Sequence, residues 1–207
     1  MSEEMLHMTL ILLTGAPASG KSSIADALSE KLKIDKISKD EFKIKLFERY
    51  GFQNHTEKKK LSLQGEEKMY HAIAEHLQNG KSLIVDNNFK SFDTIRQLRA
   101  NAPTCKVICV ELMAEPSILA ERYNDRIQMK NRHPALYTLD VFPITPESHF
   151  HPILKPEDVI KIQQDVTEDV YGDAVLKIPT NQIEQNFDLI IKRLMEFICA
   201  EMESDKK

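Results

Sequence analysis

Residues 15–22 read Gly-Ala-Pro-Ala-Ser-Gly-Lys-Ser and fit the pattern G-x-x-x-x-G-K-[ST]. The preceding residues 9–14, Thr-Leu-Ile-Leu-Leu-Thr, form a short apolar run typical of a buried parallel strand. Apolar side chains then recur at helical spacing through residues 22–32. A glycine-rich loop between a strand and a helix points several backbone N–H groups at one spot, which is how proteins bind a polyphosphate. This stretch therefore predicts a nucleotide phosphate site.

Each residue type in this loop has a physical reason to be there. Gly15 and Gly20 allow backbone angles and close approaches that a Cβ would block. The Lys21 ammonium is expected to reach the outer two phosphates, and the Ser22 hydroxyl to bind Mg²⁺. The predicted nucleotide-binding residues are Gly15, Ala16, Pro17, Ala18, Ser19, Gly20, Lys21, Ser22 and Ser23, with the backbone amides of residues 18–22 facing the phosphates.

The length and composition are those of an ordinary globular protein. With 207 residues and no recognisable linker, the chain is expected to form a single domain, residues 1–207. No apolar run approaches the roughly 20 residues of a membrane helix, and Glu3 and Glu4, rather than basic residues, precede the first apolar stretch. These features predict a protein without a signal peptide and without membrane partners.

The cysteines indicate the redox compartment of the protein, and the net charge indicates the kind of partner it binds. Cys105, Cys109 and Cys199 lack C-x-x-C spacing and lie in apolar segments, so we interpret them as reduced core residues of a cytoplasmic protein. The net charge of −4 disfavours a protein that holds long nucleic acid through its overall field, although it leaves a local basic channel open. The charged run at residues 57–60, Glu-Lys-Lys-Lys, is interpreted as a solvated helix face.

Strand-like and helix-like patterns alternate along the rest of the chain. Such alternation favours βαβ units. Together with the phosphate loop it predicts an α/β fold of the P-loop NTPase type, with a five-stranded, mostly parallel sheet flanked by helices. Beyond the first strand and helix, strands are expected at residues 32–37, 82–86, 105–112 and 174–178, and helices from residue 38 and at residues 57–78, 93–100, 116–130, 156–167 and 184–199.

Two carboxylates follow predicted strands and are candidates for chemistry. Asp86 ends the strand expected beside the phosphate-loop strand, so it is predicted to lie near Ser22 and to bind Mg²⁺ directly or through water; a helix or turn cap is the alternative. Ser38 fits a helix N-cap with Glu41 at the capping-box position, which puts Asp40 in the first helical turn. There Asp40 is a candidate base for a substrate hydroxyl; a charge that favours the helix dipole is the alternative.

Three arginines lead into residues 131–156, a proline-rich stretch without lasting periodicity. Arg122 and Arg126 are four apart on a predicted helix and share a face, and Arg132 follows them. Arginines on a closing segment stabilise the charge of a phosphoryl group in transfer, so residues 120–156 are predicted to be a lid and substrate-binding insertion. The alternatives are ion pairs on the helix surface and a loop without function.

Taken in order, these motifs resemble the small P-loop kinases related to polynucleotide 5′-kinase and the zeta-toxin group, among them AAA-type predicted kinases with a Walker A motif. The likeness rests on residues 15–22, on Ser-Lys-Asp-Glu-Phe-Lys at 38–43 and on Leu-Ile-Val-Asp-Asn-Asn at 83–88. It implies that Asp40 is the base and that Lys43, where the group usually has arginine, contacts the substrate. It also implies that residues 179–181 pass near the adenine of a bound nucleotide.

The sequence therefore favours an ATP- and Mg²⁺-dependent phosphotransferase that moves the γ-phosphate of ATP to a hydroxyl, with Lys21, Asp40 and Arg126 as catalytic residues. A small molecule, a nucleotide-like compound and a nucleic-acid 5′-hydroxyl are all compatible acceptors, and the net charge slightly favours the smaller ones. Two alternatives stay open at this stage. One is a nucleotide-dependent switch or ATPase without a small-molecule acceptor, and the other is a toxin-like kinase neutralised by a partner protein.

Overall fold

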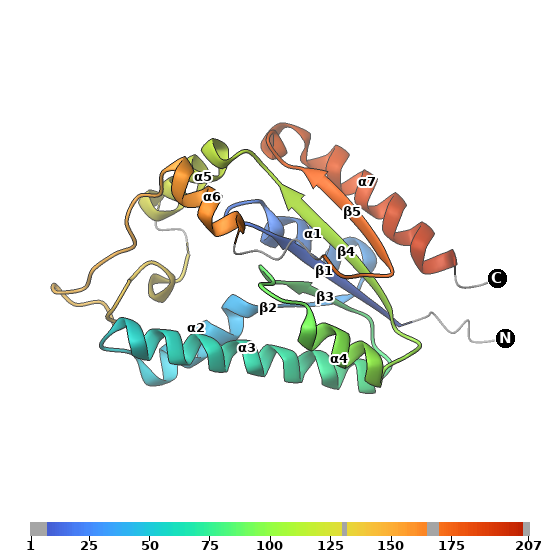
Figure 1. The fold of residues 1–207 in the computed structure, drawn as a ribbon, viewed down its shortest axis with the longest axis horizontal. Helices are drawn as coiled ribbons and strands as arrows, with labels where there is room; N and C mark the ends of the chain where they lie inside the picture. The colour runs from blue at the N-terminus through green and yellow to red at the C-terminus, as the bar shows by residue number, and fades with distance from the viewer. Residues whose placement is uncertain (1–7, 130–131, 165–169, 205–207) are drawn as a thin grey trace.

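The predicted strands form one fully parallel sheet (Figure 1). The computed structural model describes residues 8–129, 132–164 and 170–204. The strand order is β2-β3-β1-β4-β5, with the phosphate-loop strand at the centre. This confirms the predicted α/β fold of the P-loop type. The strands are β1 (Thr9–Gly15), β2 (Asp35–Ser38), β3 (Leu83–Asp86), β4 (Lys106–Met113) and β5 (Ala174–Pro179).

Helices cover both faces of the sheet, because β1 is apolar on both sides. Leu10 and Leu12 face a core that includes α3 and α4, while Ile11 and Leu13 face a core built with α1 and α7. Two further helices, α5 and α6, pack against each other near the carboxyl ends of the strands (Figure 1). The helices are α1 (Lys21–Leu32), α2 (Lys39–Tyr50), α3 (His55–Gln78), α4 (Asp93–Asn101), α5 (Pro116–Met129), α6 (Pro156–Gln164) and α7 (Ile183–Ser204).

The central position of β1 locates the site. The chain passes from β1 to β2 and β3 on one side, and only then to β4 and β5 on the other. In open parallel sheets, ligands bind outside the carboxyl ends of the strands where the winding direction changes. Leu13 in β1 pairs with Asp86 in β3, and Ser38 in β2 pairs with the same residue. The phosphate loop, Asp86 and the start of α2 therefore meet at one edge of the sheet.

Two predicted boundaries are wrong. The helix predicted at residues 184–199 runs from Ile183 to Ser204 as α7. The strand expected at residues 32–37 begins at Asp35, because Leu32 still belongs to α1 and Lys33 ends that helix in the left-handed conformation, with φ 57°. The predicted start of α2 is confirmed, since the Ser38 hydroxyl accepts a hydrogen bond from the Glu41 backbone N–H at 3.2 Å. The last residues of the helix predicted at 156–167 lie outside the described residues.

The expectation of free cysteines in apolar surroundings is matched by the fold. Cys105 and Cys109 are free thiols buried in the core, and Cys199 is a half-buried free thiol. Across residues 8–129, 132–164 and 170–204, no helix has both the length and the apolar character needed to span a bilayer.

Gly65 sets the distance between α2 and α3. A Cβ at this position would lie 3.0 Å from the Lys43 backbone nitrogen and 3.1 Å from its Cα. We expect Gly65→Ala to lower the free energy of unfolding by about 1–2 kcal/mol, because the crowding outweighs the helix propensity that alanine would add. Chemical denaturation measures this, with the exposed Gln64→Ala as the control. A more stable Gly65→Ala protein would show that α2 moves away without cost.

Candidate active site

The phosphate loop joins β1 to α1 through glycine-dependent geometry. Gly15 has φ 136°, and a Cβ there would lie 2.4 Å from the Leu112 carbonyl oxygen. Gly20 has φ 97° and is the N-cap residue of α1. No acidic side chain lies in the first turn of α1, and no side chain caps it. The first N–H groups of this helix are therefore available to an anion.

Lys21 lies folded over the loop. Its Nζ donates hydrogen bonds to the carbonyl oxygens of Gly15 and Ala16, both at 2.8 Å. Burial lowers the pKa of Lys21 to about 8, and Asp86 opposes this effect while Arg126 adds to it. Polyphosphate in the loop would offer this ammonium a stronger partner than two neutral carbonyl groups.

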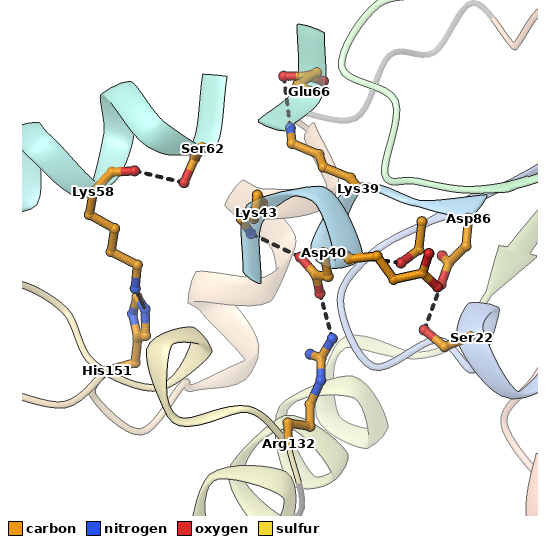
Figure 2. A network of polar contacts seen from close by, with 12 residues as sticks. Ser22, Lys39, Asp40, Lys43, Lys58, Ser62, Glu66, Asp86, Arg132 and His151 are labelled. Atoms are coloured by element: carbon orange, nitrogen blue, oxygen red, sulfur yellow. Dashed lines mark hydrogen bonds and ion pairs between the residues drawn. The ribbon is translucent and has the colours of Figure 1, made fainter. Parts of the chain in front are cut away.

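Ser22 and Asp86 lie together, as the sequence analysis predicted. The Ser22 hydroxyl donates to Asp86 Oδ2 at 2.6 Å, and Asp86 is only 9% exposed (Figure 2). A hydroxyl and a carboxylate are oxygen ligands of the kind that Mg²⁺ binds while keeping water and phosphate oxygens in its other positions. This donor set therefore fits a magnesium ion beside the phosphate loop.

Asp40 lies between two cations from different elements (Figure 2). Its Oδ1 accepts from Lys43 Nζ at 2.9 Å, and its Oδ2 accepts from the Arg132 guanidinium. Burial alone would raise the pKa of Asp40, but Lys43 and Arg132 outweigh burial and hold the pKa below its usual range. The carboxylate is thus fully charged and strongly bound in this structure.

A cavity of about 330 Å³ connects these groups. The phosphate loop and α2 form two of its walls, and α5 and the segment after it form another. The predicted site residues that line it are Pro17, Ala18, Lys21, Ser22, Asp40, Lys43, Asp86, Arg126 and Arg132. Gly15, Ala16, Ser19, Gly20 and Ser23 are absent from that lining but form the loop and first helical turn behind it.

The three predicted lid arginines do not act together in this structure. Arg126 and Arg132 line the cavity, whereas Arg122 is turned toward the loop after β5. Arg122 donates to the carbonyl oxygens of Thr180 at 2.8 Å and Asn181 at 3.0 Å, and pairs with Glu184 at 2.8 Å. Arg122 lies one helical turn before Arg126. At that position its guanidinium is within hydrogen-bond distance of the backbone at Thr180 and Asn181. The expectation that Arg122 faces the phosphates is therefore corrected.

Unlike Arg122 and Arg132, Arg126 forms no ion pair with a carboxylate in the part of the chain that the structure describes. It is half-buried and lines the cavity. Burial lowers its pKa, and the nearby Arg132 lowers it further. An unpaired guanidinium in the wall of a cavity is suited to an anionic ligand.

Lys58 was missed by the sequence analysis. The run at residues 57–60 was interpreted as a solvated face, but Lys58 is only 8% exposed. Its ammonium donates to the Thr138 carbonyl and lies 3.2 Å from His151 Nε2 (Figure 2). A signal was present, since Lys58 shares one helical stripe with Gly65 and Met69, which are also buried.

A family model described as an AAA domain matches residues 10–140. The chain belongs to this AAA domain family. The matched region contains the phosphate loop, Asp40, Asp86 and the three arginines, so most of the candidate site lies within the AAA domain.

A curated relative and two solved structures extend the comparison. A candidate adenylate kinase of Sulfurisphaera tokodaii is 30% identical over 82 residues, 40% of this chain and 42% of that protein, so the match spans less than half of that relative. A candidate kinase from Chloroflexus aurantiacus is 25% identical with a TM-score of 0.72, covering 95% of this chain and 98% of that chain. A sugar kinase from Janibacter sp. shares the fold, with 14% identity and a TM-score of 0.56 over 92% of this chain and 94% of that one.

These likenesses support the expected resemblance at a coarse level. Each of the three proteins is named as a kinase, and the two solved structures share the fold of this chain. None of the three is named as a polynucleotide 5′-kinase or a zeta toxin, so the finer resemblance stays a prediction.

His151 gives the stability of the protein a pH dependence that can be measured. Burial, and next the Lys58 ammonium, lower its pKa from 6.5 to about 4. Below pH ~6.5 the histidine of the unfolded chain binds a proton, whereas that of the folded chain stays neutral. The free energy of unfolding therefore falls as the pH drops toward 4. We expect His151→Gln to reduce this slope by up to about 1.4 kcal/mol per pH unit, measured by denaturation at several pH values.

The control for this prediction is His71→Gln, which replaces an exposed histidine of α3. Equal slopes in wild type and His151→Gln would contradict the inference that His151 is held neutral beside Lys58.

Proposed function

We propose that this AAA domain is an ATP- and Mg²⁺-dependent phosphotransferase that moves the γ-phosphate of ATP to a hydroxyl. The observation that carries the proposal is one cavity lined on one side by Lys21 and Ser22 and on the other by Asp40. A phosphate loop alone would serve a switch equally well. A carboxylate across the same cavity gives a second reactant a place to bind and a group to take its proton.

Different residues of the cavity would bind the phosphates, bind the magnesium ion and stabilise the transferring group. Residues 15–23 would hold the phosphates, with Lys21 leaving the Gly15 and Ala16 carbonyl groups for the outer phosphate oxygens. Ser22 and Asp86 would hold the magnesium ion, which neutralises charge on the β- and γ-phosphates when bound. Arg126, which has no carboxylate partner among the described residues, would stabilise the charge on the transferring group.

The transfer step balances with groups of this chain and two substrates. The acceptor oxygen forms a bond to the γ-phosphorus, and the bond from that phosphorus to the β–γ bridging oxygen breaks. ADP leaves with the electron pair of the broken bond, and Asp40 takes the hydroxyl proton. Lys43 and Arg132 would orient Asp40 and the acceptor from opposite sides of the carboxylate.

The other end of the nucleotide is proposed to lie at the loop after β5. Arg122 bonds to the backbone of Thr180 and Asn181, so it would fix the segment expected near adenine instead of a phosphate. The predicted lid, residues 120–156, would then be anchored at one end by Arg122. Asn124 adds an anchor, because its side chain exchanges two hydrogen bonds with the Leu154 backbone, at 2.9 and 2.8 Å.

Acceptor-stimulated formation of ADP tests the proposal. Purified protein is incubated with ATP·Mg²⁺, with and without hydroxyl compounds, and Lys21→Met serves as the blank. A hydroxyl compound that raises ADP formation well above the rate in water supports a phosphotransferase. One slow rate with every compound, together with nucleotide-dependent binding of a protein partner, would favour the switch instead.

A further inference from the structure

The acceptor end of the cavity carries more positive than negative charge. Lys39 is neutralised from outside by Glu66, at 2.8 Å. Lys43 and Arg132, in contrast, share the single carboxylate of Asp40 (Figure 2). Of the described residues that line the whole cavity, two are acidic and five are cationic: Asp40 and Asp86 against Lys21, Lys39, Lys43, Arg126 and Arg132.

Phosphates of ATP do not account for all of this excess. Lys21 belongs to the phosphate loop and Arg126 to α5. Both line the cavity, and both are suited to the phosphates of the nucleotide. Lys43 lies on α2, on the side of Asp40 away from Ser22 (Figure 2). One positive charge at Lys43 and Arg132 is therefore left over after Asp40 is counted, and it faces the place of the second substrate.

A folded cap limits the size of that substrate. The cap, residues 134–151, begins with a short 3-10 helix whose Leu136 lines the cavity together with Tyr137. A backbone hydrogen bond joins the two ends of the cap, since the His151 N–H donates to the Tyr137 carbonyl at 2.9 Å. Lys58 ties it to α3 through the Thr138 carbonyl.

Aromatic side chains from α2 and from the α2–α3 connection pack against the cap. Phe52, in the α2–α3 connection, exchanges backbone hydrogen bonds with Phe142 at 2.8 and 2.9 Å. Phe47, Phe52 and the cap residue Ala135 are buried in one cluster. The cavity that Leu136 and Tyr137 of the cap help to line has a volume of about 330 Å³, a size that suits a small molecule.

Resting on the proposed function, we infer that the acceptor is a small hydroxyl compound that also carries a phosphate or carboxylate group. Lys43 and Arg132 bind that anionic group. The two cations that hold Asp40 in this structure are thus drawn toward the substrate as it binds. Asp40 is left with a free lone pair for the substrate hydroxyl.

Transfer of Lys43 and Arg132 from Asp40 to the substrate anion explains why a base is held by two cations in this structure. Burial raises the pKa of Asp40, while Lys43 and Arg132 lower it and prevail, so the carboxylate of this structure is a weak proton acceptor. An anion that competes for both cations reverses the balance in the presence of the correct substrate. Water, which carries no such anion, leaves Asp40 restrained, and this limits wasteful hydrolysis of ATP.

The test compares acceptors in matched pairs with labelled ATP·Mg²⁺. Glycerol is paired with glycerol 3-phosphate, glucose with gluconate, ribose with ribose 5-phosphate, and a 5′-hydroxyl oligonucleotide stands for polymers. We expect the acidic member of at least one pair to exceed its neutral partner in kcat/KM by roughly tenfold or more. The phosphate and carboxylate arms identify which anion is bound.

Lys43→Met sharpens the comparison, with the exposed Lys59→Met as a control of equal charge change. The quantity measured is the ratio of kcat/KM for the acidic and neutral acceptors, because any general effect on Asp40 cancels in it. Lys43→Met is expected to bring the ratio down by roughly tenfold, and Lys59→Met to leave it unchanged.

The outcomes separate this inference from the proposed function. Neutral acceptors or the oligonucleotide phosphorylated as well as the acids, or a ratio that Lys43→Met does not change, would overturn the inference and leave the phosphotransferase standing. A complete lack of transfer to every acceptor, with ATP·Mg²⁺ bound, would overturn the proposed function and the inference with it.

Discussion

Lys21→Met is expected to lower phosphoryl transfer by roughly 10³-fold or more, the largest effect of any single substitution considered. The ammonium is within 2.8 Å of two loop carbonyl groups, so it is already positioned where the phosphates would bind. Methionine keeps much of the length of the side chain and removes its charge. Charge that develops on the γ-phosphate would then lack its main partner from the loop. Steady-state kinetics with ATP·Mg²⁺ and an acceptor measures the loss.

The control for this substitution is Lys31→Met, which removes an exposed lysine at the other end of α1. It is expected to retain wild-type turnover, and both variants should unfold at similar temperatures. Near-normal turnover in Lys21→Met would contradict the assignment of residues 15–22 as the site where γ-phosphate reacts.

Asp40→Asn is expected to lower kcat by roughly 10²-fold or more while ATP binding is retained. Asparagine keeps the shape of the side chain but cannot accept the proton of the acceptor hydroxyl. It also breaks two ion pairs, with Lys43 and Arg132, which leaves two neighbouring cations without their carboxylate. Kinetics of transfer, together with equilibrium binding of a nucleotide analogue, separates the two steps.

Asp35→Asn is the matched control, since it removes an exposed carboxylate at the start of β2, just before α2. Turnover should be unchanged in this variant. If Asp40→Asn also keeps full turnover, Asp40 is a positioning or structural group, and the proton leaves by another route.

Local sequence patterns were sufficient for the nucleotide side of the site. The phosphate loop, the strand before it and the strand ending in Asp86 each carry their signal within a few residues. Because neighbouring parallel strands end at the same edge, the contact between Ser22 and Asp86 followed from the strand order. The chain's fold class could be predicted for the same reason.

The acceptor side depends on contacts between distant segments, which local patterns do not encode. Asp40 and Arg132 were each identified, but their ion pair joins residues 92 positions apart. Lys58 was taken for a surface residue, because its burial depends on a cap that lies 80 residues further along the chain. Arg122 was assigned to phosphate because it shares a helix face with Arg126. The loop after β5, 58 residues away, provides its carbonyl partners instead.

The most direct test of the central claim follows the γ-phosphate itself. The protein is incubated with ATP·Mg²⁺ labelled at the γ-position and with the acceptor pairs described above, and the products are separated by chromatography. The account predicts label in a new compound derived from an acceptor, and none in that compound with Lys21→Met. Label found only in ATP and inorganic phosphate, from protein that binds ATP·Mg²⁺, would contradict it.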